Sequence, residues 1–121
     1  MRFFNFIKDG EILLKHEFGI MQDAPEPEER YDKYEPLKYN CISIDDRYVE
    51  EIDSYLNNVD FYWHTLDMPA RGIDYTGITL IPPTSLQEFI AIIEYIDEFN
   101  ELKGLLKKAL SESKWVIHYG L

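Results

Sequence analysis

Residues 75–93 of the chain read YTGITLIPPTSLQEFIAII, and this stretch contains the strongest signals for the fold. The segment from Tyr75 to Ile81 is rich in β-branched residues, which favours a strand, and two prolines follow it. After the prolines, Ser85 and Glu88 have the spacing of a capping box, the sequence pattern of a helix start. Apolar residues then recur at helical spacing, so the sequence predicts a strand followed directly by a helix.

Two more helices are predicted around this stretch, because apolar residues recur there at the same spacing. The first runs from Asp45 or Asp46 to Asn58. The other follows a break at residues 97–100 and carries apolar residues along one face, namely Leu102, Leu105, Leu106, Ala109 and Leu110.

Strands are predicted at the remaining apolar-rich runs, which are residues 2–8, 11–18, 37–44, 59–65, 75–81 and 114–119. Asp9-Gly10 favours a tight hairpin between the first two runs. Strands and helices are mixed without regular β-α-β alternation. The sequence therefore predicts an α+β fold: a single mainly antiparallel sheet with about three helices packed on it, and residues 1–121 in one domain.

Residues 22–36 are predicted to form an acidic, exposed loop. They contain three prolines and six acidic residues among few large apolar groups, which is typical of a mobile connection. Residues 67–74 contain Pro69 and Gly72 and are predicted to form a second loop.

The chain is strongly acidic, with 23 Asp and Glu against 12 Lys and Arg and a formal net charge of −11. The excess lies at residues 22–35, 45–60 and 84–101. Such a charge repels nucleic acid and anionic lipid and attracts cationic partners, so we expect neither a nucleic-acid nor a membrane partner. The first apolar run is too short for a signal peptide, and no stretch is long enough to span a membrane. These features predict a cytoplasmic protein.

The unneutralised acids are the candidate binding residues. Asp46, Glu50 and Asp53 are spaced along one side of the first helix, opposite its apolar face. The second helix carries acids with no basic residue among them. We expect a cationic partner to bind Asp46, Glu50, Asp53, Glu88, Glu94, Glu28 and Glu29. The alternative is that these acids only keep the protein soluble.

Few side chains are placed for chemistry. The single cysteine, Cys41, lies within a predicted strand and is expected to be a buried structural thiol. His16, His64 and His118 lie far apart and lack metal-ligand spacing, so we expect no metal ion and no cofactor.

His64 is the best candidate for a catalytic base, because it lies three residues before Asp67 and near Arg71. A carboxylate can orient an imidazole as a base. However, no serine or cysteine stands in a strained turn that would present a nucleophile. The favoured interpretation is a loop held by a His64–Asp67 hydrogen bond. A small hydrolase that uses this pair is the alternative.

Three motifs carry a resemblance to a known class of proteins: CISID at residues 41–45, YTGITLIPP at residues 75–83 and WVIHYG at residues 115–120. The segment of residues 39–121 resembles the small acidic immunity proteins of bacterial polymorphic-toxin and contact-dependent inhibition systems. The resemblance implies a non-enzymatic cytoplasmic protein that blocks a cognate toxin, often a nuclease, by covering its active site. It assigns no binding residues, since these interfaces differ from pair to pair.

Charge and resemblance favour the same function, because a nuclease must be basic around its active site to hold phosphate. We expect an immunity or inhibitor protein, a monomer or weak dimer, that binds and neutralises a basic toxin domain such as a nuclease. The second hypothesis is a general interaction or regulatory module for another basic protein.

Overall fold

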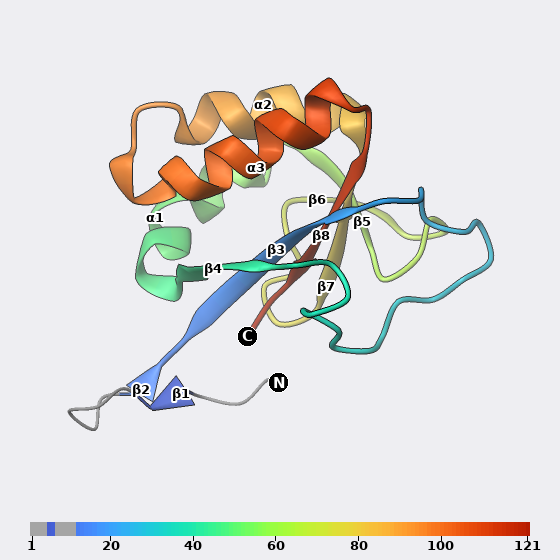
Figure 1. The fold of residues 1–121 in the computed structure, drawn as a ribbon, viewed down its shortest axis with the longest axis horizontal. Coiled ribbons are helices and arrows are strands. Elements are labelled where there is room, and N and C mark those ends of the chain that lie inside the picture. Colours follow the sequence, from blue (N-terminus) through green and yellow to red (C-terminus); the bar gives the residue numbers. More distant parts are fainter. Residues whose placement is uncertain (1–4, 7–11) are drawn as a thin grey trace.

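The computed structural model describes residues 5–6 and 12–121 of the chain. The elements of this part, shown in Figure 1, follow one another as β1 (Asn5–Phe6), β2 (Ile12–Leu13), β3 (Lys15–Met21), β4 (Ile42–Asp45), α1 (Asp46–Leu56), β5 (Asp60–Trp63), β6 (Pro69–Arg71), β7 (Ile78–Ile81), α2 (Pro83–Ile93), the 3-10 turn η1 (Asp97–Phe99), α3 (Asn100–Ser111) and β8 (Trp115–Tyr119).

The large sheet of the described residues is open and has six strands in the order β4-β3-β8-β7-β5-β6. Each neighbouring pair in it is antiparallel. β1 and β2 pair with each other in a separate two-stranded sheet. Together with the three helices, the large sheet confirms the predicted α+β fold.

The predicted first hairpin is described only in part. Its expected turn, Asp9-Gly10, lies outside the described residues. The run predicted as one strand at residues 11–18 is divided, because β2 pairs with β1 while β3 begins at Lys15 in the large sheet. β3 then continues to Met21, beyond the predicted end.

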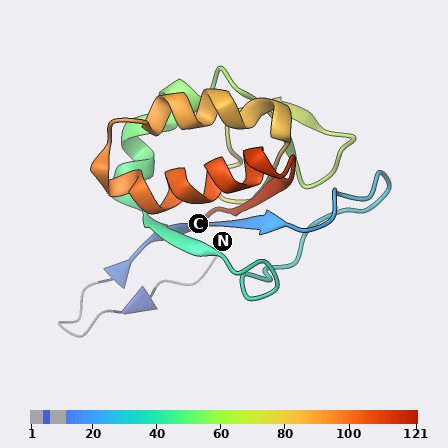
Figure 2. The same cartoon turned by 45° about the horizontal axis from the view of Figure 1, so that its top comes forward.

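The three helices form one layer over one face of the large sheet (Figure 2). The main core lies between these layers and includes Phe18 of β3, Phe61 of β5 and Phe89 of α2. The Phe89 ring centroid lies 5.9 Å from that of Phe18 and 6.1 Å from that of Phe61. α2 therefore joins strands that are separated by β8 and β7 in the sheet.

α2 begins at Pro83 and has no serine cap. Proline fits the first turn of a helix, where its missing N–H leaves no hydrogen bond unmade. Ser85 lies inside the helix and is buried, and its Oγ donates to the carbonyl oxygen of Asp60 at 2.5 Å. The predicted capping box of Ser85 and Glu88 is therefore wrong, because the serine links α2 to β5.

Other strands also differ from the prediction. β7 begins at Ile78 and not at Tyr75, because residues 75–77 form a turn before it. β4 begins at Ile42, so Cys41 is a half-buried residue before the strand and not part of it. β6 lies within residues 67–74, which were predicted to be a loop. It is an edge strand that begins with Pro69, and an edge position tolerates a proline because one side of the strand makes no ladder bonds.

The second face of the large sheet is also apolar, and residues 22–41 lie over it. Tyr31 and Tyr39 pack against a cluster of apolar side chains from β3, β7 and β8. Pro25 is buried and Tyr31 is half-buried, so the segment predicted as an exposed loop is exposed only in part. Five of its acidic residues do face solvent, and one of them, Asp32, pairs with Arg30. We call the other four the loop acids: Asp23, Glu26, Glu28 and Glu29.

The packing of α2 on the sheet leads to a first prediction. We expect Phe89→Ala to lower the free energy of unfolding by about 3–5 kcal/mol, because it removes a fully buried ring between the helix and two strands. Urea unfolding followed by circular dichroism measures this change. Gln87→Ala, on the exposed side of α2, is the matched control and should change the free energy by less than about 0.5 kcal/mol. Equal effects of the two substitutions would contradict the packing.

Candidate functional site

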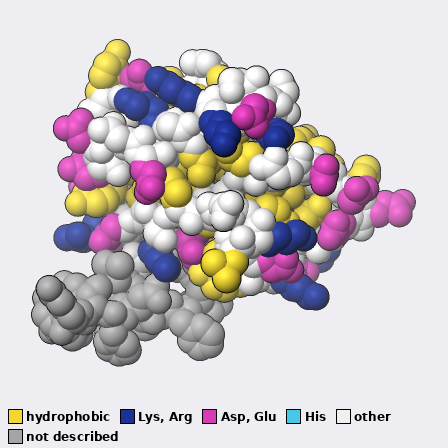
Figure 3. All heavy atoms as spheres, viewed as in Figure 1, with side chains coloured by type: hydrophobic (Ala, Val, Ile, Leu, Met, Phe, Trp, Pro, Cys, Tyr) yellow, Lys and Arg dark blue, Asp and Glu magenta, His cyan; other side chains and the backbone are white. Residues whose placement is uncertain are grey.

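The seven candidate binding acids belong to separate elements of the fold. Glu28 and Glu29 belong to the loop over the second face, whereas the other five belong to α1 and α2 or directly follow α2. In Figure 3, acidic side chains gather at the right margin over the loop and at the left margin near α1 and the connection between α2 and α3. On this side of the molecule, the acidic side chains therefore gather in more than one place.

Asp46 is not an exposed residue of α1. It is 6% exposed and lies in the first turn of the helix, directly after β4. The Nε2–H of His16 donates to Asp46 Oδ1 at 2.9 Å, and the Tyr75 hydroxyl donates to the same oxygen. The prediction that Asp46 shares an exposed face with Glu50 and Asp53 is wrong, because these two donors allow its carboxylate to be buried.

Among the other candidate acids, Glu94 is partly neutralised by Lys107 of α3, whose Nζ lies 3.9 Å from Glu94 Oε1. Within the described residues, no basic side chain pairs with the remaining five, which are Glu28, Glu29, Glu50, Asp53 and Glu88. Asp53 is half-buried, and the other four are exposed.

The position of Asp46 changes the titration of its neighbours. Burial acts to raise the pKa of Asp46, but hydrogen bonds from Tyr75 and His16 outweigh it and hold this pKa below its ordinary value of 3.8. Glu50, one turn further along α1, has a raised pKa because of its hydrogen bond with Asp46 and the charge of Asp46. Burial, followed by the contact with Asp46, raises the pKa of Tyr75. Of these three groups, Asp46 therefore loses its proton at the lowest pH.

Two histidines that are distant in sequence, His16 and His118, extend the hydrogen bonds of Asp46 into the sheet. The Nδ1 atom of His16 lies 2.9 Å from Nε2 of His118. On the other side of the His118 ring, Nδ1 lies 3.1 Å from Oγ1 of Thr79, its cross-strand neighbour on β7. We call this set, Asp46, His16, His118 and Thr79, the buried polar chain.

The hydrogen bonds of the buried polar chain have one consistent direction when both imidazoles are neutral. The Asp74 N–H donates to Thr79 Oγ1 at 2.8 Å, and the Thr79 hydroxyl donates to His118 Nδ1. The Nε2–H of His118 then donates to His16 Nδ1, and the Nε2–H of His16 donates to Asp46. His16, Thr79 and His118 are 0% exposed, so no substrate can reach them. The buried polar chain therefore joins β3, β8 and β7 to α1.

Sequence reasoning missed the buried polar chain, although one signal was present. On β3, His16 alternates with Phe18 and Ile20, and these positions face the helices. On β8, His118 shares a face with Val116. A histidine at a core-facing position of a strand needs a buried hydrogen-bond partner. This requirement could have predicted that His16 and His118 form hydrogen bonds in the core.

Asp46→Asn should lower the free energy of unfolding by about 1–3 kcal/mol at neutral pH, because two buried donors lose their ionised acceptor. Since the folded-state pKa of Asp46 is depressed, its contribution is present above the ordinary pKa and is lost as pH falls through the folded value. The difference in the free energy of unfolding between wild type and variant, measured by urea unfolding, should therefore decrease from about pH 6 to about pH 3. Glu51→Gln, exposed on the same helix, is the control. A difference of constant size would contradict the ionised role of Asp46.

His64 has partners other than the predicted Asp67. Its Nδ1 lies 2.9 Å from the carbonyl oxygen of Tyr31 and 2.8 Å from Oδ1 of Asp32. Its Nε2 lies 3.1 Å from Oδ2 of Asp74. The predicted His64–Asp67 pair is wrong, because the loop and the turn before β7 bring other carboxylates to the ring.

The other residues near His64 in sequence have local partners. Asp67 is exposed, and its N–H donates to Thr65 Oγ1 at 3.3 Å. Arg71 is exposed on β6 and pairs with Asp60 at 3.4 Å. The hydrolase hypothesis depended on the His64–Asp67 pair, and we do not retain it.

His64 fastens the acidic loop to the sheet. The Tyr31 N–H donates to the carbonyl oxygen of His64 at 2.7 Å, while the His64 ring contacts the carbonyl oxygen of Tyr31. The Tyr31 hydroxyl in turn accepts from the Glu26 N–H at 3.1 Å. The backbone that carries Glu26, Glu28 and Glu29 is therefore closed by the bond between Glu26 and Tyr31 and is tied at Tyr31 to His64, which directly follows β5.

We expect His64→Ala to loosen the loop while the core stays folded. Loss of the ring contacts should lower the free energy of local opening by about 1–3 kcal/mol, which corresponds to roughly 5- to 150-fold faster trypsin cleavage within residues 30–38. Limited proteolysis with mass spectrometry locates and times the cuts. Asp67→Ala tests the alternative partner and should leave the cleavage rate unchanged. The reverse order of effects would favour the His64–Asp67 pair.

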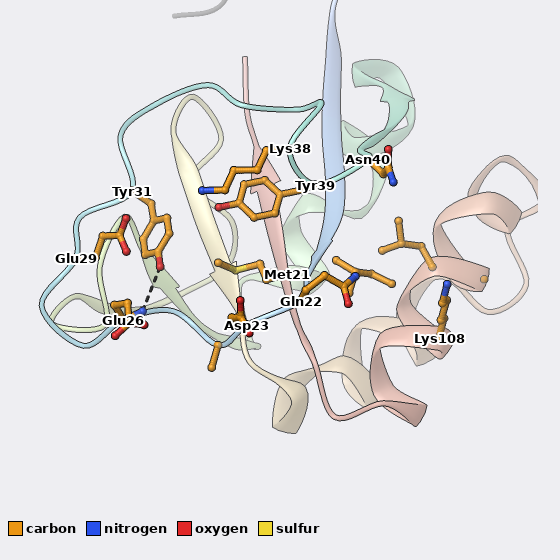
Figure 4. A pocket seen from close by; sticks show the side chains of 14 residues that line it. Met21, Gln22, Asp23, Glu26, Glu29, Tyr31, Lys38, Tyr39, Asn40 and Lys108 are labelled. Carbon is orange, nitrogen blue, oxygen red and sulfur yellow. Dashed lines mark hydrogen bonds between the residues drawn. The ribbon is translucent and has the colours of Figure 1, made fainter.

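A cavity of about 620 Å³ lies between the acidic loop and α3 (Figure 4). Ile20 and Met21, at the end of β3, give it apolar walls. On the loop side, Figure 4 shows Glu26, Glu29 and Tyr31 beside one another, and Lys108 of α3 stands on the opposite side. The cavity therefore has an acidic and aromatic end and a basic end.

Comparisons with protein-family models, with curated proteins and with solved structures gave no match. In the described part of the chain, no three His, Cys, Asp or Glu side chains are grouped as metal ligands. Across residues 5–6 and 12–121, each helix is too short or too polar to cross a bilayer.

Proposed function

We propose that this protein is a non-enzymatic inhibitor that binds and neutralises a basic toxin domain through its acidic loop. The observation that carries the proposal is the presentation of the loop acids. They are exposed, and no basic side chain of the described residues forms an ion pair with them. Their backbone is fastened to the sheet by Tyr31 and His64.

Two of the cations near the loop acids are engaged with other carboxylates. Arg30 pairs with Asp32 at 2.7 Å, and Lys38 pairs with Glu35 at 3.6 Å. The loop acids therefore keep their negative charge available for a partner. An ordered binding segment loses less conformational entropy on association than a disordered one, and complementary charge accelerates association.

A nuclease toxin suits this surface because its active site must be basic to hold phosphate. Carboxylates on a fixed backbone can occupy the positions of substrate phosphates and exclude the substrate. The resemblance of residues 39–121 to bacterial immunity proteins favours the same kind of partner. A regulatory module for another basic protein would need a similar surface, so toxicity of the partner is the property that separates the two functions.

The test begins with capture of the partner from the source organism on the immobilised protein. We expect a basic protein that is released by raised salt, because exposed charge pairs are screened by ions. Expressed alone, the partner should arrest growth, and co-expression with this chain should restore growth. A basic but harmless partner would favour the regulatory module. A partner whose binding does not depend on salt would contradict both.

Two sets of neutralising substitutions identify the surface with the same change in charge. We expect neutralisation of the loop acids (Asp23→Asn, Glu26→Gln, Glu28→Gln and Glu29→Gln) to slow association with the captured partner at least about tenfold at low salt. The matched set on the helices is Glu50→Gln, Asp53→Asn, Glu88→Gln and Glu98→Gln, and it should have a smaller effect. Stopped-flow or biolayer measurements give the rates. A larger effect of the helix set would contradict binding through the loop.

A further inference from the structure

We propose that the cavity between the acidic loop and α3 receives an arginine side chain of the basic partner. The inference rests on the proposed function and names the group that the loop surface binds. Its basis is the combination of a concave site, one aromatic wall and carboxylates that the chain itself leaves unneutralised. A volume of about 620 Å³ falls within the range of roughly 300–1,000 Å³ that ligand sites have.

Charge inside the cavity favours a cation at the loop end. Asp23, Glu26 and Glu29 line this end, and the described part of the chain pairs none of them with a basic group. Two lysines also line the cavity, which leaves three carboxylates against two ammonium groups. Lys38 is paired with Glu35, and Lys108 lies across the cavity on α3 (Figure 4).

Tyr31 supplies the aromatic wall. Its ring is half-buried and lies beside Glu26 and Glu29 in Figure 4. Burial, together with the neighbouring charge of Glu29, raises the pKa of Tyr31, so the phenol is neutral and the ring face remains suitable for a cation. The second tyrosine of the lining, Tyr39, already has Lys38 Nζ at 5.3 Å from its ring centroid. Tyr31 is therefore the ring that a partner cation meets.

Arginine fits this arrangement better than lysine does. A guanidinium is planar, stacks on a tyrosine ring and can donate two parallel hydrogen bonds to a carboxylate. An ammonium is more strongly hydrated and makes neither contact as well. The cavity presents a ring and carboxylates side by side, which matches the planar group. Ile20 and Met21 can pack against the methylenes of the arginine stem.

The cavity is tested with the full chain labelled with ¹⁵N and three blocked peptides, acetyl-Gly-Arg-Gly-amide, acetyl-Gly-Lys-Gly-amide and acetyl-Gly-citrulline-Gly-amide. Citrulline has the shape of arginine without its charge. Amide chemical shifts report where each peptide binds. We expect saturable shifts from the arginine peptide at residues 20–31 and 104–108, binding of the lysine peptide at least fivefold weaker, and no saturable shifts from the citrulline peptide.

Matched variants separate the cavity from the general charge of the surface. Glu26→Gln with Glu29→Gln removes two lining carboxylates and should weaken binding of the arginine peptide at least tenfold. Glu28→Gln with Glu98→Gln makes the same charge change at exposed acids outside the lining and should leave the affinity unchanged. The amide spectra also show that each variant is folded. Equal affinities of the two variants, or equal shifts from arginine and citrulline, would overturn the inference.

Failure of this inference can be told apart from failure of the proposed function. If the captured partner binds the Glu26→Gln, Glu29→Gln variant as tightly as wild type, the cavity is not its contact and the function still stands. If the arginine peptide binds but no basic protein is captured, the cavity stands and the proposed function fails. Shifts spread evenly over α1 and the loop would show non-specific attraction and would overturn the cavity.

Discussion

The central strands of this protein are apolar on both faces, and the helices cover only one of them. All four residues of β7 are buried, as are four of the five residues of β8. Water is excluded from the helix side by α1, α2 and α3, which leaves the side of Ile78, Leu80 and Ile117 to be covered by another part of the chain. Residues 22–41 do so through Tyr31 and Tyr39. The position of the acidic loop thus follows from the need to bury the second face.

The core on the helix side of the sheet is mostly apolar, but it also contains the buried polar chain. The buried polar chain crosses β3, β8 and β7 and ends on Asp46 at the start of α1. These groups can be buried because both ring nitrogens of His16 and both of His118 have a hydrogen-bond partner within 3.1 Å. Hydrogen bonds are directional. The buried polar chain therefore restricts the position of the start of α1 relative to the three strands more than apolar contacts alone would.

Local patterns were enough to predict the three helices and most strands, but not β6 at the edge of the sheet. The three helices are each buried on one side, so their apolar residues recur at helical spacing, as Val49, Ile52 and Leu56 do on α1. The start of α2 was harder, because Pro83 and Ser85 are both valid start signals and only the contact of Ser85 with Asp60 decides between them.

The partners of individual side chains could not be predicted, because they depend on contacts between distant segments. His16 and His118 are separated by 102 residues, and Tyr31 and His64 by 33. No local pattern specifies that these pairs meet. The exposed acids of the loop were predictable from composition, whereas the burial of Asp46 required knowledge of where His16 and Tyr75 lie.

The loop acids lie in a stretch that contains neither helix nor strand between β3 and β4. Their side chains are exposed, so a substitution of one of these acids leaves the hydrogen bonds of the sheet and the packing of the core unchanged. Substitutions among these acids can thus change which partner binds under the proposed function, while Tyr31 and His64 still hold the segment in place. Relatives with the same architecture would be expected to share these anchoring positions and to differ in the charges between them.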